Sequence, residues 1–308
     1  MLKIGSNISE VRIDGNLDHL RRDLDSFQKF GLTAAEIGVH GTDVIRNGKL
    51  ESGRLLEIQK ILNQYPFAYS VHAPNPLNLM DEEDFDLHVE VMRSSLEFTQ
   101  AIGAEIMVYH PGRFQAEESF GPLGKIELQE DQCQKLLDLE AEIILNFASE
   151  FPGQVIAMEN ARPYRYHSPY CYAETISALK EQVERINRKN VAITLDFGHL
   201  HMSSKFYGFE EEAAVRQIAD LIRHCHVHDN FGGSVYHTDK QQTHQIPLGK
   251  GDSHMPIGWG NIDFDKLFSC FYDRYQGLLI TELRGRYFES TGESAANLLC
   301  IIEKLKAA

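Results

Sequence analysis

The feature that most constrains the fold is one pattern that recurs eight times along the 308 residues, a short apolar run followed by a longer amphipathic stretch. The runs predict strands at 2–7, 34–39, 69–74, 105–110, 155–160, 191–196, 223–229 and 278–283. The stretches predict helices near 16–30, 52–64, 82–102, 126–150, 173–188, 209–220, 263–275 and 291–306. Because the strands are continuously apolar rather than alternating, we expect a parallel sheet whose outer face is covered by helices.

Eight such units can form a closed (β/α)8 TIM barrel or an open, doubly wound α/β sheet. An open dinucleotide-binding sheet carries G-x-G-x-x-G after its first strand and gathers its ligand residues at one switch point. This chain lacks that motif, and polar residues end nearly every strand. We therefore predict a single (β/α)8 barrel domain over residues 1–308, with its site at the carboxyl ends of the strands. The irregular segment 230–262 is expected to be a lid or a disordered segment.

Composition indicates a soluble globular protein of a reducing compartment. The five cysteines are odd in number and scattered without a C-x-x-C pair, which argues against disulfides and zinc fingers. We find no signal-like segment and no run of about 18 apolar residues, so we expect a cytoplasmic protein without membrane contact. The formal net charge of −15 disfavours nucleic acid as a partner without excluding it. These features leave the oligomeric state open.

Side chains of the types that commonly bind metal ions lie at or just after the predicted strand ends. They are His72, His110, Glu159, Asp196, His199, His226, Asp252, His254 and Glu282. Each alone is more often a hydrogen-bonded structural residue, but carboxylates crowded at one rim would repel one another and partly protonate. Divalent cations remove that repulsion, and mixed imidazole and carboxylate donors favour zinc, or else Mn, Fe or Co, over Ca or Mg. We expect one to three ions, held by three neighbouring groups of these residues.

The motifs SVHAP, YHPG, AMEN, TLDFGH, HVHDN, DSHMPIGWGNID and ITE, between about residues 70 and 285, resemble the xylose isomerase-like TIM-barrel superfamily. That superfamily includes sugar and sugar-phosphate isomerases and epimerases, and the endonuclease-IV-type apurinic endonucleases. The resemblance implies that all nine residues are ligands, which fills the trinuclear pattern of the endonucleases. The four-ligand set of ketose epimerases is contained within it, as Glu159, Asp196, His226 and Glu282.

Three positions depart from the endonuclease form of these motifs. Asn75 stands where an aromatic commonly helps to distort DNA, His228 replaces the usual Asn in HVHDN, and Trp259 occupies a position where an acidic residue is frequent. An arginine that epimerases place shortly after the third ligand has no match in NFGGSV. None of these departures alters a ligand position.

Two enzymatic functions follow from this resemblance. In an isomerase or epimerase of a small sugar or sugar phosphate, Glu159 and Glu282 would act as base and acid around one ion, and His199 would orient a substrate hydroxyl. In a phosphoester hydrolase of the apurinic endonuclease type, Glu159 would bridge two of three ions. The net charge and Asn75 disfavour DNA, so we favour the isomerase or epimerase. A barrel that binds sugar without turnover is a weaker alternative, because it needs no ligand set.

Several residues are predicted to contact the substrate. The strand-end loops carry the cations Arg113, Lys125, Arg162, Arg165, Lys205, Lys240, Lys250, Arg284 and Arg286, which predict a locally positive mouth. Arg162 and Arg165 would clamp a phosphate or carboxylate, or else lie in a solvated loop. Glu36 would reach the mouth or be a buried, paired carboxylate, and Trp259 would wall a pocket or pack internally. The expected partner is a small anionic or polyhydroxy molecule.

Overall fold

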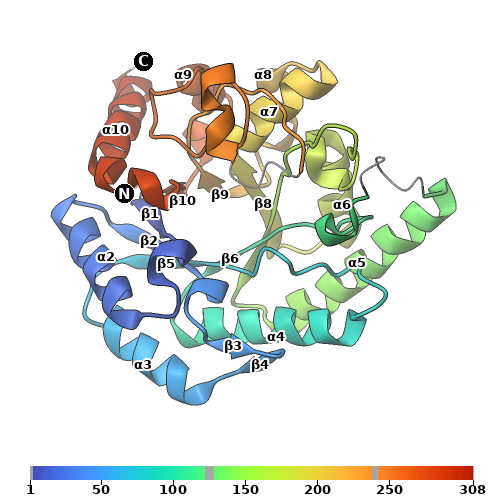
Figure 1. Cartoon of the computed structure of the whole chain (residues 1–308), viewed down its shortest axis with the longest axis horizontal. Helices are drawn as coiled ribbons and strands as arrows, with labels where there is room; N and C mark the ends of the chain where they lie inside the picture. The colour runs from blue at the N-terminus through green and yellow to red at the C-terminus, as the bar shows by residue number, and fades with distance from the viewer. Residues whose placement is uncertain (1–2, 122–127, 238–241, 308) are drawn as a thin grey trace.

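The computed structural model describes residues 3–121, 128–237 and 242–307. Its eight long strands form one closed parallel barrel in the order β1-β10-β9-β8-β7-β6-β5-β2 (Figure 1). They are β1 (Lys3–Ile8), β2 (Ala34–Gly38), β5 (Ala68–His72), β6 (Ile106–Tyr109), β7 (Val155–Glu159), β8 (Val191–Asp196), β9 (Ile222–His226) and β10 (Leu278–Thr281). The first and last strands pair with each other from Lys3 opposite Leu278 to Ser6 opposite Thr281, which closes the barrel. The predicted (β/α)8 barrel is confirmed, and the open sheet is excluded.

Eight helices follow the strands in turn and pack around the barrel (Figure 1). They are α2 (Leu17–Lys29), α3 (Ser52–Leu62), α4 (Phe85–Ala101), α5 (Glu130–Glu150), α6 (Ile176–Ile186), α8 (Glu211–Ile218), α9 (Phe264–Ser269) and α10 (Thr291–Ala307). Helix α2 illustrates why they form: the Asn16 side chain accepts the N–H of Asp18, and Leu20, Leu24 and Phe27 bury one face.

Most predicted elements end within a few residues of the observed ones. The strand predicted at 223–229 ends three residues too late, because the chain leaves the sheet after His226. The helix predicted at 263–275 is two pieces, α9 and the 3-10 helix η5 (Tyr272–Arg274). Both errors concern element ends, where hydrophobic periodicity carries least information.

Helix α7 (Phe197–Tyr207) was not predicted, although it lies directly after β8. Residues 197–204 are all buried, so the segment has no exposed polar face and no amphipathic pattern to recognise. The Asp196 side chain accepts the N–H of His199 at 2.7 Å and caps this helix, and Gly208, with φ of +76°, ends it. Tertiary packing rather than sequence periodicity therefore sets this helix.

The remaining short elements lie in the loops. They are α1 (Glu10–Ile13), the hairpin strands β3 (Ile45–Arg46) and β4 (Lys49–Leu50), and the 3-10 helices η1 (Val39–Gly41), η2 (Glu117–Ser119), η3 (Tyr172–Glu174), η4 (Gln242–Leu248) and η6 (Gly285–Ser290). Sequence patterns did not separate them from irregular loop.

The described part of the segment 230–262 is held by hydrogen bonds. Buried Asp229 bridges to Met255 through the backbone, and its carboxylate accepts the N–H groups of Gly258 and Ile262. A Cβ at Gly260 would collide with that carboxylate, so the turn requires a glycine there. The prediction of a disordered segment is wrong for these residues.

The main apolar core is one large cluster of strand and helix side chains, and Ala34, Leu278 and Ile280 form a separate small cluster on strands β2 and β10 of the barrel. Toward the carboxyl ends the interior becomes polar, with Glu36, Ser70 and His224 fully buried. In the part of the chain that is described, we find no helix that is both long and apolar enough to cross a bilayer.

Candidate functional site

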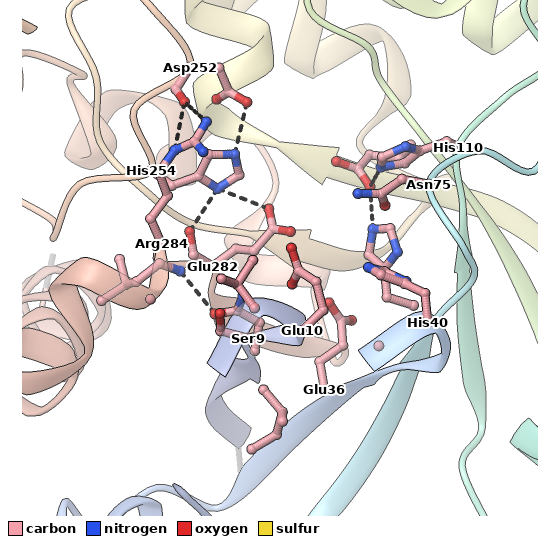
Figure 2. A pocket seen from close by; sticks show the side chains of 18 of the residues that line it. Ser9, Glu10, Glu36, His40, Asn75, His110, Asp252, His254, Glu282 and Arg284 are labelled. Atoms are coloured by element: carbon pink, nitrogen blue, oxygen red, sulfur yellow. Dashed lines mark hydrogen bonds and ion pairs between the residues drawn. The ribbon is translucent and has the colours of Figure 1, made fainter. Parts of the chain in front are cut away.

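A cavity of about 710 Å³ opens at the carboxyl ends of the barrel strands. Figure 2 shows its two walls, with Asp252 and His254 on one side and His110 and Asn75 on the other. Its volume is in the range of pockets that enclose small molecules. All of the predicted ligand residues lie at this cavity or in contact with a residue that lines it.

Four of these residues form a central group, which comprises Glu159, Asp196, His226 and Glu282 and whose ligand atoms all lie within 4.8 Å of one another. Nδ1 of His226 is 3.3 Å from Oε1 of Glu159, 3.4 Å from Oε2 of Glu282 and 3.9 Å from Oδ2 of Asp196. Three of the residues end β7, β8 and β9, and Glu282 directly follows β10. Adjacent strands of the barrel therefore bring one imidazole and three carboxylates together.

Two buried atoms of the central group make no well-aligned hydrogen bond among the described residues, although charged side chains lie 3.2 and 3.3 Å from them. The two atoms are Nδ1 of His226 and Oε2 of Glu159. Buried polar atoms without partners are costly, and native proteins usually satisfy them. A nitrogen lone pair surrounded by three carboxylates is the donor set expected around a zinc-type cation. The residues present thus fit a divalent metal ion.

A second group, His72, His110 and Glu159, lies next to the first. Oε2 of Glu159 is 3.2 Å from Nε2 of His110 and 3.6 Å from Nε2 of His72. The other oxygen of Glu159 faces the central group, so this carboxylate stands between the two groups. Such a position allows one carboxylate to bridge two cations.

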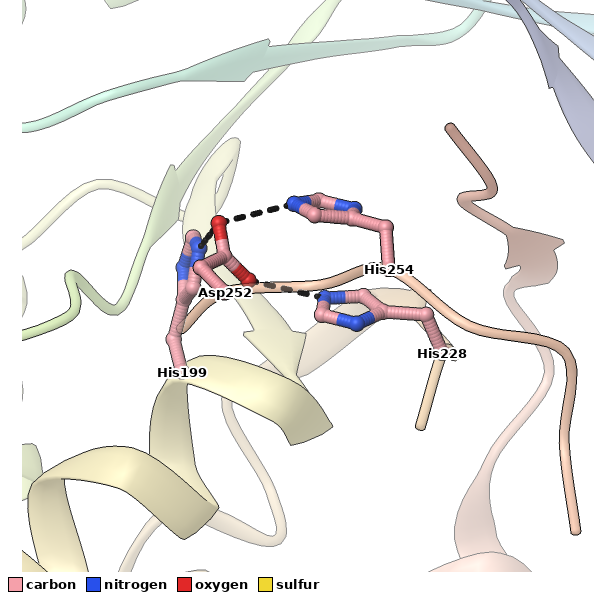
Figure 3. Close-up of side chains that lie close together, drawn as sticks. All are labelled: His199, His228, Asp252 and His254. Atoms are coloured by element: carbon pink, nitrogen blue, oxygen red, sulfur yellow. Dashed lines mark hydrogen bonds and ion pairs between the residues drawn. The ribbon is translucent and has the colours of Figure 1, made fainter. Parts of the chain in front are cut away.

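A third group contains His199, Asp252 and His254, and the structure adds His228 to it. Figure 3 shows the Asp252 carboxylate directed at the three imidazoles. Oδ2 of Asp252 is 2.8 Å from Nε2 of His254 and 3.5 Å from Nε2 of His199. Nε2 of His228 lies 3.9 Å from Oδ1 of Asp252 and 3.1 Å from Oδ2 of Asp196, between the central and third groups. Sequence reasoning noted His228 as a departure and did not assign it to the site.

The pKa shifts in these groups indicate that a positive charge between the carboxylates is stabilised. Burial alone would raise the pKa of Asp196, but His199 and His228 lower it to about 2. Burial alone would lower the pKa of His226, but Glu282, Glu36 and Glu159 hold it well above its usual value. Asp196 is therefore anionic, and a cationic neighbour is favoured beside it. A bound metal ion supplies that charge without protonating a histidine.

Glu36 occupies the floor of the cavity, where only 1% of its surface is exposed. Its Oε1 lies 2.8 Å from Nε2 of His226, and its Oε2 lies 3.0 Å from Nε2 of His224 and accepts the Ser70 hydroxyl at 2.9 Å. Burial would raise the pKa of Glu36, but His226 and His224 hold it well below its usual value. Glu36 is therefore a buried, paired carboxylate that also lines the cavity, and its predicted contact with a substrate stays a prediction.

The two arginines predicted to bind the substrate lie in different surroundings. Arg162 lines the cavity, donates to the Tyr164 hydroxyl at 2.9 Å, and has its Nε 3.5 Å from Oδ2 of Asp252. Arg165 is exposed, and its guanidinium lies 6.0 Å from the centre of the Tyr236 ring, outside the cavity lining. Of this pair, only Arg162 is placed to reach a molecule beside the third group.

Trp259 also lies outside the cavity lining, with 45% of its surface exposed. Its indole N–H donates to Glu293 at 3.0 Å, and its ring contacts Tyr287 edge-on. Trp259 thus lies at the surface, outside the lining of this cavity and outside the packed interior.

Several other predicted cations of the mouth bind the protein itself. Arg113 donates to the carbonyls of the loop at residues 75–77, Arg284 to the Asp252 carbonyl, and Lys205 to the Phe231 carbonyl. Lys125 and Lys240 lie outside the described residues. These described contacts hold the loops together and leave less free positive charge than the sequence predicted.

Comparisons with known proteins agree with this fold. The sequence model of the xylose isomerase-like TIM barrel family matches residues 24–304. Uncharacterized protein MJ1311 of Methanocaldococcus jannaschii is 27% identical over 267 residues, which are 83% of this chain and 77% of that protein.

Two solved structures of the same architecture are similar over nearly their whole lengths. A D-tagatose 3-epimerase-like protein superposes with a TM-score of 0.72 at 22% identity and covers 99% of both chains. The IolI protein with a bound zinc atom has a TM-score of 0.66 at 18% identity and covers 99% of this chain and 98% of its own. At these identities, the likeness shows the shared fold.

Proposed function

The chain belongs to the xylose isomerase-like TIM barrel family, and we propose that it is a divalent-metal-dependent isomerase or epimerase of a small sugar or sugar phosphate. The observation that carries this proposal is the central group, in which Nδ1 of His226 makes no well-aligned hydrogen bond and faces Glu159, Asp196 and Glu282. Glu159 and Glu282 of this group line a cavity of about 710 Å³. The D-tagatose 3-epimerase-like protein of the same fold supports the choice of reaction.

The proposed cofactor is a divalent cation in the central group. One imidazole nitrogen and three carboxylates suit zinc first, with Mn, Fe and Co as alternatives. When bound, such an ion polarises adjacent substrate oxygens and lowers the barrier to removing a carbon-bound proton. The zinc atom in the IolI structure is consistent with this choice.

Glu159 and Glu282 are the proposed acid and base. They lie at the ends of β7 and β10, which β8 and β9 separate, so they approach the central group from different sides. Each has an oxygen within 3.4 Å of Nδ1 of His226. A substrate carbon held between them would lose its proton to one carboxylate and regain a proton from the other.

His199 and Arg162 are the proposed substrate-binding residues. Nδ1 of His199 lies 2.8 Å from the Asn160 carbonyl, which fixes the ring, and its Nε2 lies 3.4 Å from Nη1 of Arg162. Because His199 belongs to the third group and Arg162 lies next to it, the pair would hold a hydroxyl or a phosphate oxygen of the substrate there.

Deuterium exchange tests the proposal whichever sugar the reaction yields. The zinc- or manganese-loaded protein would be incubated in D₂O with a panel of ketoses and ketose phosphates, and carbon-bound deuterium in recovered sugar would be measured by mass spectrometry. We expect incorporation with at least one sugar. Replacing Glu159 or Glu282 by Gln should slow it roughly 100-fold or more, whereas Arg165→Gln, which lies outside the cavity lining, should not. Equal exchange in all variants would contradict the assigned acid and base.

Phosphoester hydrolysis is the second candidate, and the shared position of Glu159 favours it. Because Glu159 stands between two groups and the third group lies beside them, the side chains match a three-ion arrangement. A Glu159 that bridges two ions is not free to act as a base. Elemental analysis separates the candidates: one ion per chain supports isomerisation, and three ions together with cleavage of an abasic oligonucleotide at modest salt support hydrolysis.

A further inference from the structure

Beneath the central group, the barrel interior holds a buried carboxylate that the proposed reaction does not use. Glu36 comes from β2, on the far side of the barrel from β8 and next to β1 and β5. It nevertheless contacts His226, because its side chain crosses the interior of the closed barrel to reach β9. The contact joins residues 190 positions apart in the sequence.

Every oxygen of Glu36 is engaged by a neighbour. Oε1 faces Nε2 of His226 at 2.8 Å, while Oε2 accepts the Ser70 hydroxyl at 2.9 Å and faces Nε2 of His224 at 3.0 Å. With 1% of its surface exposed, Glu36 presents no free oxygen to a substrate in the cavity. The carboxylate therefore acts on the site through His226.

The contact decides which nitrogen of His226 can bind a cation. An ionised carboxylate accepts hydrogen bonds and cannot donate them, so Nε2 of His226 carries a proton toward Glu36. Once a cation replaces the second ring proton, the lone pair therefore belongs to Nδ1, the atom that faces the carboxylates of Glu159 and Glu282. Metal-binding histidines are commonly oriented by a carboxylate on their second nitrogen in this way.

We propose that Glu36 is a positioning residue that holds His226 as the Nε2–H tautomer, with Nδ1 directed at a divalent cation in the central group. The inference rests on the metal site of the proposed function and gives Glu36 a role other than substrate binding. Ser70 and His224 hold Glu36 in turn. Burying a carboxylate is costly, and apolar residues of similar volume would stabilise the barrel at least as well. A role at the site accounts for its presence better than stability does.

The test compares Glu36→Gln with a matched control. The substitution keeps the size of the side chain but removes its charge, and it replaces one oxygen with an NH₂ group that donates hydrogen bonds. We expect zinc affinity of the central group, measured by competition with a chromophoric chelator, to fall about 10- to 100-fold. Glu36→Asp keeps the charge on a shorter side chain, so its zinc affinity should fall less. Glu140→Gln is the control, since it also removes a fully buried carboxylate, one that Tyr109 and Tyr172 hold outside the site, and it should leave zinc affinity unchanged.

Nitrogen-15 NMR of the histidine rings provides the readout that a purely structural role would not move. In zinc-loaded wild type, His226 should carry its single ring proton on Nε2, and in zinc-loaded Glu36→Gln this preference should be lost while circular dichroism stays the same. Because this spectrum needs zinc but no turnover, Glu36 can be judged even if no sugar is a substrate. An unchanged tautomer and unchanged zinc affinity in Glu36→Gln would overturn the inference. So would an additional ion in wild type that both Glu36→Gln and His224→Gln remove, because these residues would then be ligands themselves.

Discussion

Gly198 and His228 form a close contact beside the third group. A Cβ added at Gly198 would lie 2.6 Å from Nε2 and 2.7 Å from Nδ1 of His228, well inside van der Waals contact. On its other face, the His228 ring stacks on His254 with 3.8 Å between centroids. The glycine thus leaves the space in which His228 reaches Asp196.

Gly198→Ala should therefore displace His228 and destabilise the protein by about 1–3 kcal/mol, the usual cost of overpacking a filled interior. Urea unfolding of the metal-free protein measures this loss. Adding His228→Ala to the same chain should recover part of it, because the smaller side chain makes room for the methyl group. Strictly additive effects of the two substitutions would show that this contact is not what requires glycine at position 198.

The positions of some individual side chains could be predicted from the sequence, and those of others could not. The side chains at the strand ends could be predicted, because every parallel strand of a closed barrel delivers its carboxyl end to the same mouth. Trp259 and Arg165 lie in loops, whose course decides whether they face the cavity, and Glu36 points into the barrel at a depth that no spacing reveals. His228 depends on its contacts with Gly198 and Asp196. The ligand roles themselves remain predictions.

Among the secondary-structure elements, the junction of β8 and α7 depends on Asp196, which has two structural roles. Asp196 caps α7 through Oδ1, which accepts the N–H of His199, while its Oδ2 faces His226 and His228. The cap fixes the start of the helix that carries His199, and so it sets the distance between the central and third groups.

Replacing Asp196 by Asn or by Ala separates these roles. Both variants lose the carboxylate, but Asn keeps an acceptor for the His199 N–H and Ala does not. In chelator-treated protein, we expect Asp196→Ala to be about 1 kcal/mol less stable than Asp196→Asn in urea unfolding. Asn16→Ala, which removes the cap of α2 away from the site, should cost a similar amount and leave metal binding intact. Equal stability of the two Asp196 variants would mean that the cap contributes nothing to α7.

At the scale of the whole molecule, the mouth of the barrel concentrates negative charge on a chain that already carries a formal charge of −15. Glu36, Glu159, Asp196 and Asp252 are each buried with an exposure of 1% or less. A barrel that gathers such groups gains stability from any cation that binds only its folded state.

Removal of metal should accordingly lower the thermal stability of the entire barrel. At a free zinc concentration 1,000 times the dissociation constant, binding contributes about 4 kcal/mol to the free energy of unfolding. Calorimetry before and after chelation measures the fall in melting temperature, and added zinc should reverse it. Magnesium at the same concentration is the comparison, and we expect a smaller effect from it because imidazole is a poor magnesium ligand. A melting temperature insensitive to chelation and to zinc would argue against a metal centre.

The barrel and the residues at its mouth follow from the amino-acid sequence alone. Eight apolar runs with helices between them specify parallel strands, and closure of such a sheet brings distant strand ends together whatever their separation along the chain. The three-dimensional arrangement was needed to find that His228 joins the third group, which nitrogen of His226 is left for a cation, and which loop side chains reach the cavity. Those outcomes depend on side-chain directions and contacts among residues far apart in the sequence, which local patterns of hydrophobicity and charge do not encode.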